Sequence, residues 1–176
     1  NKLLRPVEMD QDQQLLPGVR AQFVTAGHIL GAASLLISLE DQDGACRVGF
    51  SGDLGRPGQL IVPDAEKLPR PETLFMETTY GNRRHKSLVE SQQELLEVIR
   101  QAYAGGGKVL IPAFAVERTQ EIIYTLAAAY RRGELPADMP VFLDSPLAIA
   151  ATEIFRAHPE FFDDPTQQIL NQGHNP

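Results

Sequence analysis

The chain has 176 residues, a length that suits one or two small domains with a substantial hydrophobic core. Hydrophobic residues make up 43% and charged residues 22%, and no apolar run is long enough for a membrane span, which excludes largely disordered and membrane-spanning chains. The net charge of −7 disfavours nucleic-acid binding through protein cations alone, although bound divalent metals would supply local positive charge.

The first third of the chain has the pattern of β structure. Residues 19–23 alternate apolar and polar side chains, as in a half-buried strand, and residues 35–39 form a second apolar run. Residues 41–44 predict a hairpin turn into a third strand over 47–50. Residues 52–71 are rich in proline and glycine and predict a long loop, which in compact domains is often functional.

From Thr73 onward the pattern alternates between strands and helices. Ser87 and Glu90 form a capping box ahead of a helix that ends at the glycines of 105–107, and two further helices are expected over 116–132 and from Pro146 to about Ala157. Strands are expected at 73–76, 108–111 and 141–143. This β-α-β-α-β-α order predicts a parallel sheet with packed helices, so the architecture changes near Gly81.

Two residues that follow strands in the first part could ligate a metal. His28 lies between glycines, and Asp53 lies in a Ser-Gly-Asp turn. An imidazole and a carboxylate from adjacent strand ends can ligate a divalent cation, but a catalytic zinc needs about three protein ligands. Because a single histidine or a turn aspartate is more often structural, these residues alone leave the metal hypothesis open.

Two further candidates follow expected strands in the second part. Open parallel sheets bind ligands beyond the carboxyl ends of their strands, so Glu77 and Ser145 would line one rim if those strands are neighbours. The structural alternatives are a solvated carboxylate for Glu77 and a helix N-cap for Ser145, and the cap is the simpler interpretation of Ser145. Cys46, the single cysteine, excludes an internal disulfide and favours a reducing, cytoplasmic location.

Five blocks, taken in order, resemble the motifs of one known family. Residues 26–34 resemble the third metal motif of the metallo-β-lactamase fold as found in the β-CASP nucleases, and Ser51-Gly52-Asp53-Leu54-Gly55 resembles the fourth. Glu77-Thr78-Thr79-Tyr80-Gly81 resembles β-CASP motif A, and residues 112–121 and 144–148 are similar to later blocks of the β-CASP insert. The glutamate in motif A favours the RNA-processing branch, with the pre-mRNA 3′-end processing endonuclease and its prokaryotic homologues.

The resemblance implies an α/β fold with two parts. Residues 1–81 would be the C-terminal part of a metallo-β-lactamase αββα sandwich, and residues 82–176 the N-terminal part of a parallel α/β β-CASP insert. The implied function is a zinc-dependent ribonuclease that hydrolyses RNA phosphodiester bonds through a metal-activated water, with two zinc ions in the intact site. The implied partner is RNA; a membrane is not expected, and a homo-oligomer is compatible with the sequence.

The resemblance also assigns roles to individual residues. His28 would be a zinc ligand, Asp53 would bridge two zinc ions, and Glu77 would act beside the metals in catalysis. Ser145 and Arg118 would hold the substrate phosphate.

The departures from the family pattern limit these expectations. The H-x-H-x-D-H block that supplies most zinc ligands is absent, so we expect the chain to be an internal fragment, inactive by itself and without tight zinc binding. The alternatives are a non-catalytic β-CASP scaffold subunit of an RNA-processing complex, another hydrolase on the lactamase fold, and a plain α/β binding domain. The sequence leaves open whether cleavage is endo- or exonucleolytic.

Overall fold

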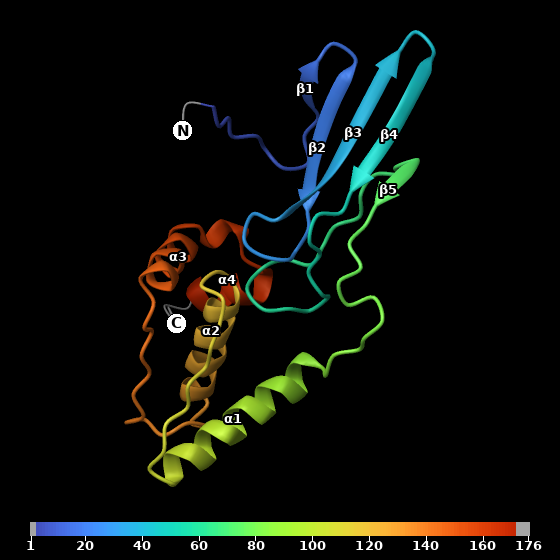
Figure 1. The fold of residues 1–176 in the computed structure, drawn as a ribbon. Helices are drawn as coiled ribbons and strands as arrows, with labels where there is room; N and C mark the ends of the chain where they lie inside the picture. Colours follow the sequence, from blue (N-terminus) through green and yellow to red (C-terminus); the bar gives the residue numbers. More distant parts are fainter. Residues whose placement is uncertain (1–2, 172–176) are drawn as a thin grey trace. The chain divides into compact units, whose positions relative to one another are not determined.

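The chain divides into two compact units, Asn1–Gly81 and Asn82–Pro176, in a computed structural model that describes residues 3–171, with side chains through residue 167. Among these residues, the regular secondary structure of the first unit is entirely strand and that of the second is entirely helix (Figure 1). No helix in this described part of the chain is both long and apolar enough to cross a membrane.

The first unit is a five-stranded sheet in the order β1-β2-β3-β4-β5. From β1 to β4, each strand pairs with the next one in the sequence in antiparallel orientation, and β5 pairs parallel to β4. Because β2 and β4 both run antiparallel to β3, the carboxyl ends of β2, β4 and β5 meet at one edge of the sheet. The strands are Gln13–Leu16, Val19–Thr25, Ala33–Asp41, Gly44–Phe50 and Thr73–Phe75.

The turn between β3 and β4 forms where the sequence predicts it. The Asp41 carboxylate accepts hydrogen bonds from the backbone N–H groups of Asp43 at 2.8 Å and Gly44 at 3.1 Å. These bonds mimic a backbone turn and favour aspartate at this position. The ladder continues from Asp41↔Gly44 to Leu35↔Phe50, so β4 begins earlier than the expected residue 47.

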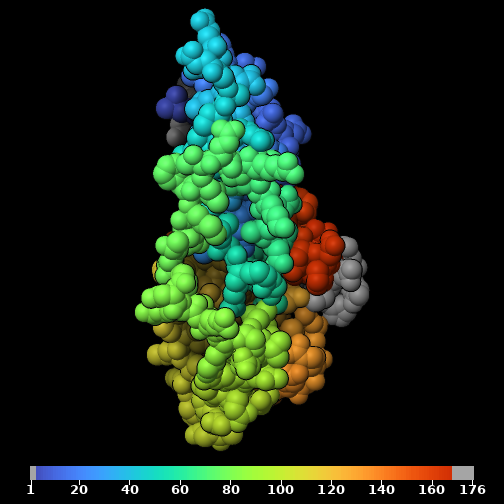
Figure 2. Space-filling model, turned by 90° about the vertical axis from the view of Figure 1, so that its right-hand side faces the viewer, coloured from blue at the N-terminus to red at the C-terminus, as the bar shows by residue number. Residues whose placement is uncertain are grey.

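The parallel strands β4 and β5 are connected by an irregular loop, residues 51–72, in place of the more usual helix. Ile61 and Val62 anchor this loop, since only 4% and 2% of their surfaces are exposed. The Glu66 N–H donates to the Thr25 carbonyl at 2.9 Å, which ties the loop to the end of β2. In the space-filling view, teal-to-green residues of this loop make up much of the visible surface of the first unit (Figure 2).

The second unit contains the helices that the sequence predicts. The capping box of α1 is confirmed, because the Ser87 hydroxyl accepts from the Glu90 N–H at 3.2 Å and the Glu90 carboxylate accepts from the Ser87 N–H at 2.9 Å. A core joins α1, α2 and the loop after α2: Leu96, Ile99, Leu126, Ala129 and Leu135. The helices are α1 Leu88–Ala104, α2 Arg118–Arg131, α3 Pro146–Ala157 and α4 Asp164–Asn171, with a 3-10 turn, η1, at Pro159–Phe161.

The strands expected at 108–111 and 141–143 are not formed in the described residues of this unit. Leu110 is 90% exposed and Phe142 is 86% exposed. A parallel strand is stable when hydrogen-bonded neighbours flank it and both faces are covered, and these two segments lack that environment. The mixed α/β class holds for the chain, and its parallel pairing lies in the first unit, between β4 and β5.

Candidate metal centre at the sheet edge

Three candidate residues of the first unit lie on loops at the same sheet edge. His28 follows β2, Asp53 follows β4 and Glu77 follows β5. The strand directions explain this convergence, since these strands have their carboxyl ends together. Loops at that edge of a sheet are a common place for ligand-binding side chains.

The loops that carry His28 and Asp53 are in backbone contact. The Gly55 N–H donates to the Ala26 carbonyl at 2.9 Å. A Cβ atom added to Gly55 would lie 1.7 Å from the carbonyl oxygen of Gly27, so only glycine allows this approach. Gly27 itself has φ +62°, in the left-handed region, and its backbone is packed against residues 63–65 of the long loop.

Gln59 holds the histidine loop from the other side. Its side-chain amide donates to the carbonyl oxygens of Gly27 and His28, the latter at 3.2 Å. The backbone at His28 is therefore fixed by the long loop, while His28 itself remains exposed. Sequence reasoning missed Gln59, because a glutamine inside an irregular loop carries no periodic or motif signal.

The Glu77 carboxylate is held by hydrogen bonds from two directions. One oxygen accepts from the Leu54 N–H at 2.7 Å and the other from the Thr79 hydroxyl at 2.6 Å. These bonds lower the pKa of Glu77 below its ordinary value of 4.5, first through the Thr79 hydroxyl and then through the Leu54 N–H, with a smaller electrostatic effect of the nearby His28. Because Leu54 follows Asp53 directly, Glu77 also fixes the loop that carries Asp53.

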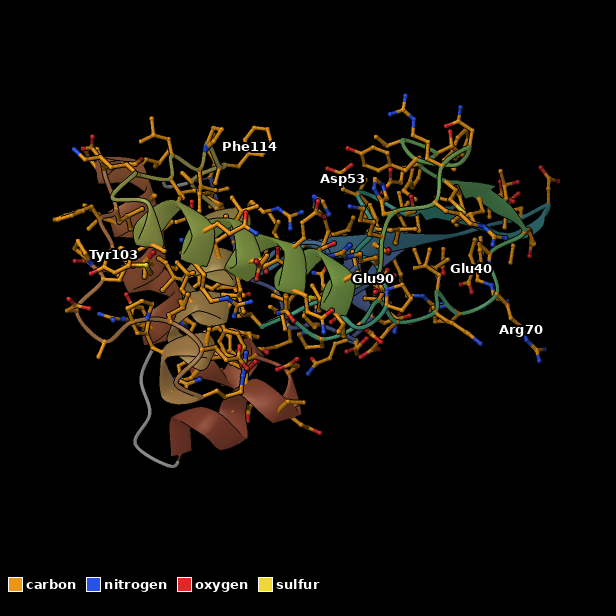
Figure 3. All side chains as sticks on the ribbon, turned by 90° about the horizontal axis from the view of Figure 1, so that it is seen from below. Glu40, Asp53, Arg70, Glu90, Tyr103 and Phe114 are labelled. Carbon is orange, nitrogen blue, oxygen red and sulfur yellow. The ribbon has the colours of Figure 1, made fainter. Side chains whose placement is uncertain are left out.

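The available donors fit part of a metal site. His28 offers an imidazole nitrogen and Asp53 an exposed carboxylate, which are ligand types that zinc accepts. Asp53 is labelled in Figure 3. Within residues 3–171, however, no three histidine, cysteine, aspartate or glutamate side chains are placed to hold one ion. Among the described residues, His28 and Asp53 thus supply two donors of the types that zinc accepts, whereas a catalytic zinc needs about three protein ligands.

The two expected phosphate-binding residues belong to the second unit. Arg118 opens α2, and its guanidinium lies 2.6 Å from the buried Glu121 carboxylate while its own side chain stays 57% exposed. Ser145 is the N-cap of α3, where its hydroxyl accepts from the Ala148 N–H at 3.2 Å. The structural role considered for Ser145 is thus present.

Sequence comparison shows which known proteins this chain resembles. Residues 119–176 match the sequence profile of the Beta-Casp domain. Ribonuclease TTHA0252 of Thermus thermophilus is 35% identical over 173 residues, which are 98% of this chain and 38% of that protein. Transcription termination factor FttA of Pyrococcus abyssi is 38% identical over 168 residues, and that of Methanosarcina mazei is 34% identical over 175 residues.

The chain is similar over nearly its whole length to ribonuclease TTHA0252 and the FttA factors, and its residues 119–176 match the Beta-Casp domain. The class of protein that it resembles is therefore that of the β-CASP proteins. The alignment with the P. abyssi FttA includes 93% of this chain and 25% of that protein, and the alignment with the M. mazei FttA includes 97% and 27%. The chain therefore spans a minor part of the relatives that it matches.

Proposed function

We propose that the full-length protein is a metal-dependent ribonuclease and that this chain carries part of its catalytic centre. The observation that carries the proposal is the convergence of His28, Asp53 and Glu77 at one sheet edge through the Gly27–Gly55 contact. The names of the relatives support an RNA substrate, since one is a ribonuclease and several are transcription termination factors.

The proposed roles follow the positions of the side chains. His28 and Asp53 bind zinc, together with ligands from elsewhere in the protein, because two residues are too few for a stable site. A bound pair of zinc ions would activate a water and stabilise charge on the phosphate oxygens. Asp53 suits a bridging position because its carboxylate has two oxygens on an exposed turn.

Glu77 has a double role in this proposal. Its carboxylate orients the Asp53 loop through Leu54 and stays ionised at neutral pH, because its pKa is lowered. An ionised carboxylate beside the metals could accept a proton from the attacking water or a hydrogen bond from a histidine of the site.

The second unit supplies the proposed phosphate contacts. Arg118 retains an exposed guanidinium despite its pairing with Glu121, and a guanidinium binds phosphate oxygens well. Ser145 lies at the amino end of α3, where backbone N–H groups and the helix dipole favour an anion. Both assignments belong to the proposal and place RNA phosphates near the starts of two helices.

The test uses the full-length protein with zinc content and RNA cleavage measured together. We expect about two zinc ions per chain, consistent with a two-metal site, and cleavage of a labelled single-stranded RNA that Asp53→Ala abolishes. Asp43→Ala is the matched control, because Asp43 is an exposed aspartate in the β3–β4 turn and lies away from the sheet edge. A folded, metal-free and inactive full-length protein would replace the ribonuclease by the alternative of a non-catalytic scaffold subunit.

A further inference from the structure

Ser51 is a buried serine at the junction of the two carboxylate-bearing loops. Only 5% of its surface is exposed, and it directly follows β4. Its backbone N–H donates to the Phe75 carbonyl at 2.9 Å, and its carbonyl accepts from the Ser34 hydroxyl at 2.7 Å. The backbone of Ser51 is therefore held by β5 on one side and β3 on the other.

The Ser51 hydroxyl makes two further bonds that lead into the site. It donates to the Gly52 carbonyl at 2.7 Å and accepts from the Glu77 N–H at 3.0 Å. A hydroxyl has one proton and can accept through its lone pairs, so both bonds form together. Because the side chain is buried, water cannot easily replace either bond after its removal.

These bonds couple the Asp53 loop to Glu77 at two points. Ser51 connects the start of the loop to the Glu77 backbone, and the Glu77 carboxylate returns to Leu54 just beyond Asp53 at 2.7 Å. The turn between them is tight, since Gly52 has φ +58° and a Cβ there would lie 2.9 Å from the Ala33 carbonyl oxygen. The position of Asp53 relative to Glu77 is thus set by a closed ring of backbone and hydrogen bonds.

We propose that Ser51 is a positioning residue of the metal-binding edge, whose hydroxyl fixes Glu77 and, through it, the loop that presents Asp53 to a metal. The proposal rests on the proposed function for its consequence in metal binding, but the positioning itself is a property of the metal-free protein. Hydrogen-bond partners of metal ligands commonly affect metal affinity or activity by about 10- to 100-fold.

The first measurement is amide hydrogen exchange of the metal-free full-length protein. In Ser51→Ala the Glu77 N–H loses its partner directly, whereas the Leu54 N–H keeps its partner and changes only if Glu77 moves. We expect the Leu54 amide to exchange at least about fivefold faster, the effect of one net hydrogen bond. An unchanged Leu54 amide would overturn the positioning role, whether or not the protein binds metal.

Thr125→Val is the matched control for the loss of a buried hydroxyl. Thr125 is 5% exposed, like Ser51, and its hydroxyl accepts from the Gln92 side-chain amide at 3.3 Å within the second unit. We expect Ser51→Ala to accelerate Leu54 exchange and Thr125→Val to leave it unchanged. Ser51→Thr retains a hydroxyl and should keep that amide protected.

The second measurement is zinc retention against a competing chelator. We expect Ser51→Ala to weaken zinc retention by about 10-fold or more and Thr125→Val to leave it within about twofold. An equal loss of zinc retention in both variants would contradict the positioning role and leave Ser51 with a structural role only. A wild-type protein that binds no zinc, but in which Ser51→Ala still accelerates Leu54 exchange, would refute the proposed metal site and leave the positioning role intact.

Discussion

Gly55 offers the sharpest test of the arrangement at the sheet edge, through the substitution Gly55→Ala. The added Cβ would lie 1.7 Å from the Gly27 carbonyl oxygen and 3.0 Å from the His28 nitrogen. Both contacts are with backbone, so no side chain can rotate away, and the loops that carry His28 and Asp53 must separate. The φ of Gly55 is not in the left-handed region, so the effect is purely steric.

The expected cost follows from two contributions. Inserting a methyl group into a packed site costs about 1–3 kcal/mol, and losing the Gly55–Ala26 hydrogen bond costs roughly 1 kcal/mol more. We therefore expect Gly55→Ala to lower the free energy of unfolding of the metal-free full-length protein by about 2–4 kcal/mol. Urea denaturation followed by circular dichroism measures this change.

Gly105→Ala serves as the control for the loss of a glycine. Gly105 has φ −82° at the end of α1, and its added Cβ would lie 3.5 Å from the nearest atom, an ordinary contact. We expect a change within about 0.5 kcal/mol there. If Gly55→Ala proves as well tolerated as Gly105→Ala, the backbone contact between the two site loops is not present in the folded protein.

Two further substitutions test strain and charge. Glu117 is the central residue of a γ-turn, with φ 68° and ψ −65° and a 3.0 Å bond from the Arg118 N–H to the Val116 carbonyl. Because this conformation costs a non-glycine residue about 1–3 kcal/mol, Glu117→Gly should raise the unfolding temperature in calorimetry, whereas Glu94→Gly within α1 should lower it. Glu77 has a lowered pKa, so its stabilising effect is complete above pH 4.5 and is lost as the pH falls through the folded-state value. The stability difference between wild type and Glu77→Gln, measured without metal, should shrink on acidification, and a constant difference would contradict the hydrogen bonds to the ionised carboxylate.

Local sequence signals predicted the features that depend on neighbouring residues. Asp41 and Gly44 form the expected turn, and Ser87 and Glu90 form the expected capping box. In each case the side chain bonds to a backbone group within three residues, so the physical cause lies within the motif itself. Helix α3 likewise spans the expected residues, from Pro146 to Ala157.

Features that depend on distant residues were less predictable. The segments at 108–111 and 141–143 have the composition of strands, but pairing requires partners that a local pattern does not specify. Helix α2 buries Gln120, Glu121 and Thr125, which an apolar periodicity cannot identify as core positions. The buried amide of Gln120 donates to the Thr152 hydroxyl of α3 at 2.9 Å, a contact between residues far apart in sequence.

The candidate site contains residues that the sequence predicted and residues that it did not. His28, Asp53 and Glu77 were singled out because they follow strands and because their surroundings resemble family motifs, and the structure brings these three residues to one edge. Ser51 and Gln59, which hold the loops in place, were not singled out. Their importance comes from hydrogen bonds across the sheet and the long loop, which no periodicity in the sequence encodes.

The irregular β4–β5 connection has a consequence for the order of folding. The β3–β4 hairpin closes through a turn whose bonded residues are only three apart in sequence. The sheet-edge loops instead close through contacts separated by 23 residues, from Leu54 to Glu77, and by 31, from His28 to Gln59. Because longer loops lose more chain entropy on closure, the hairpins should form before the long loop is fixed. During synthesis of the chain, the sheet can therefore exist for a time as a folded scaffold whose prospective catalytic edge is still unassembled.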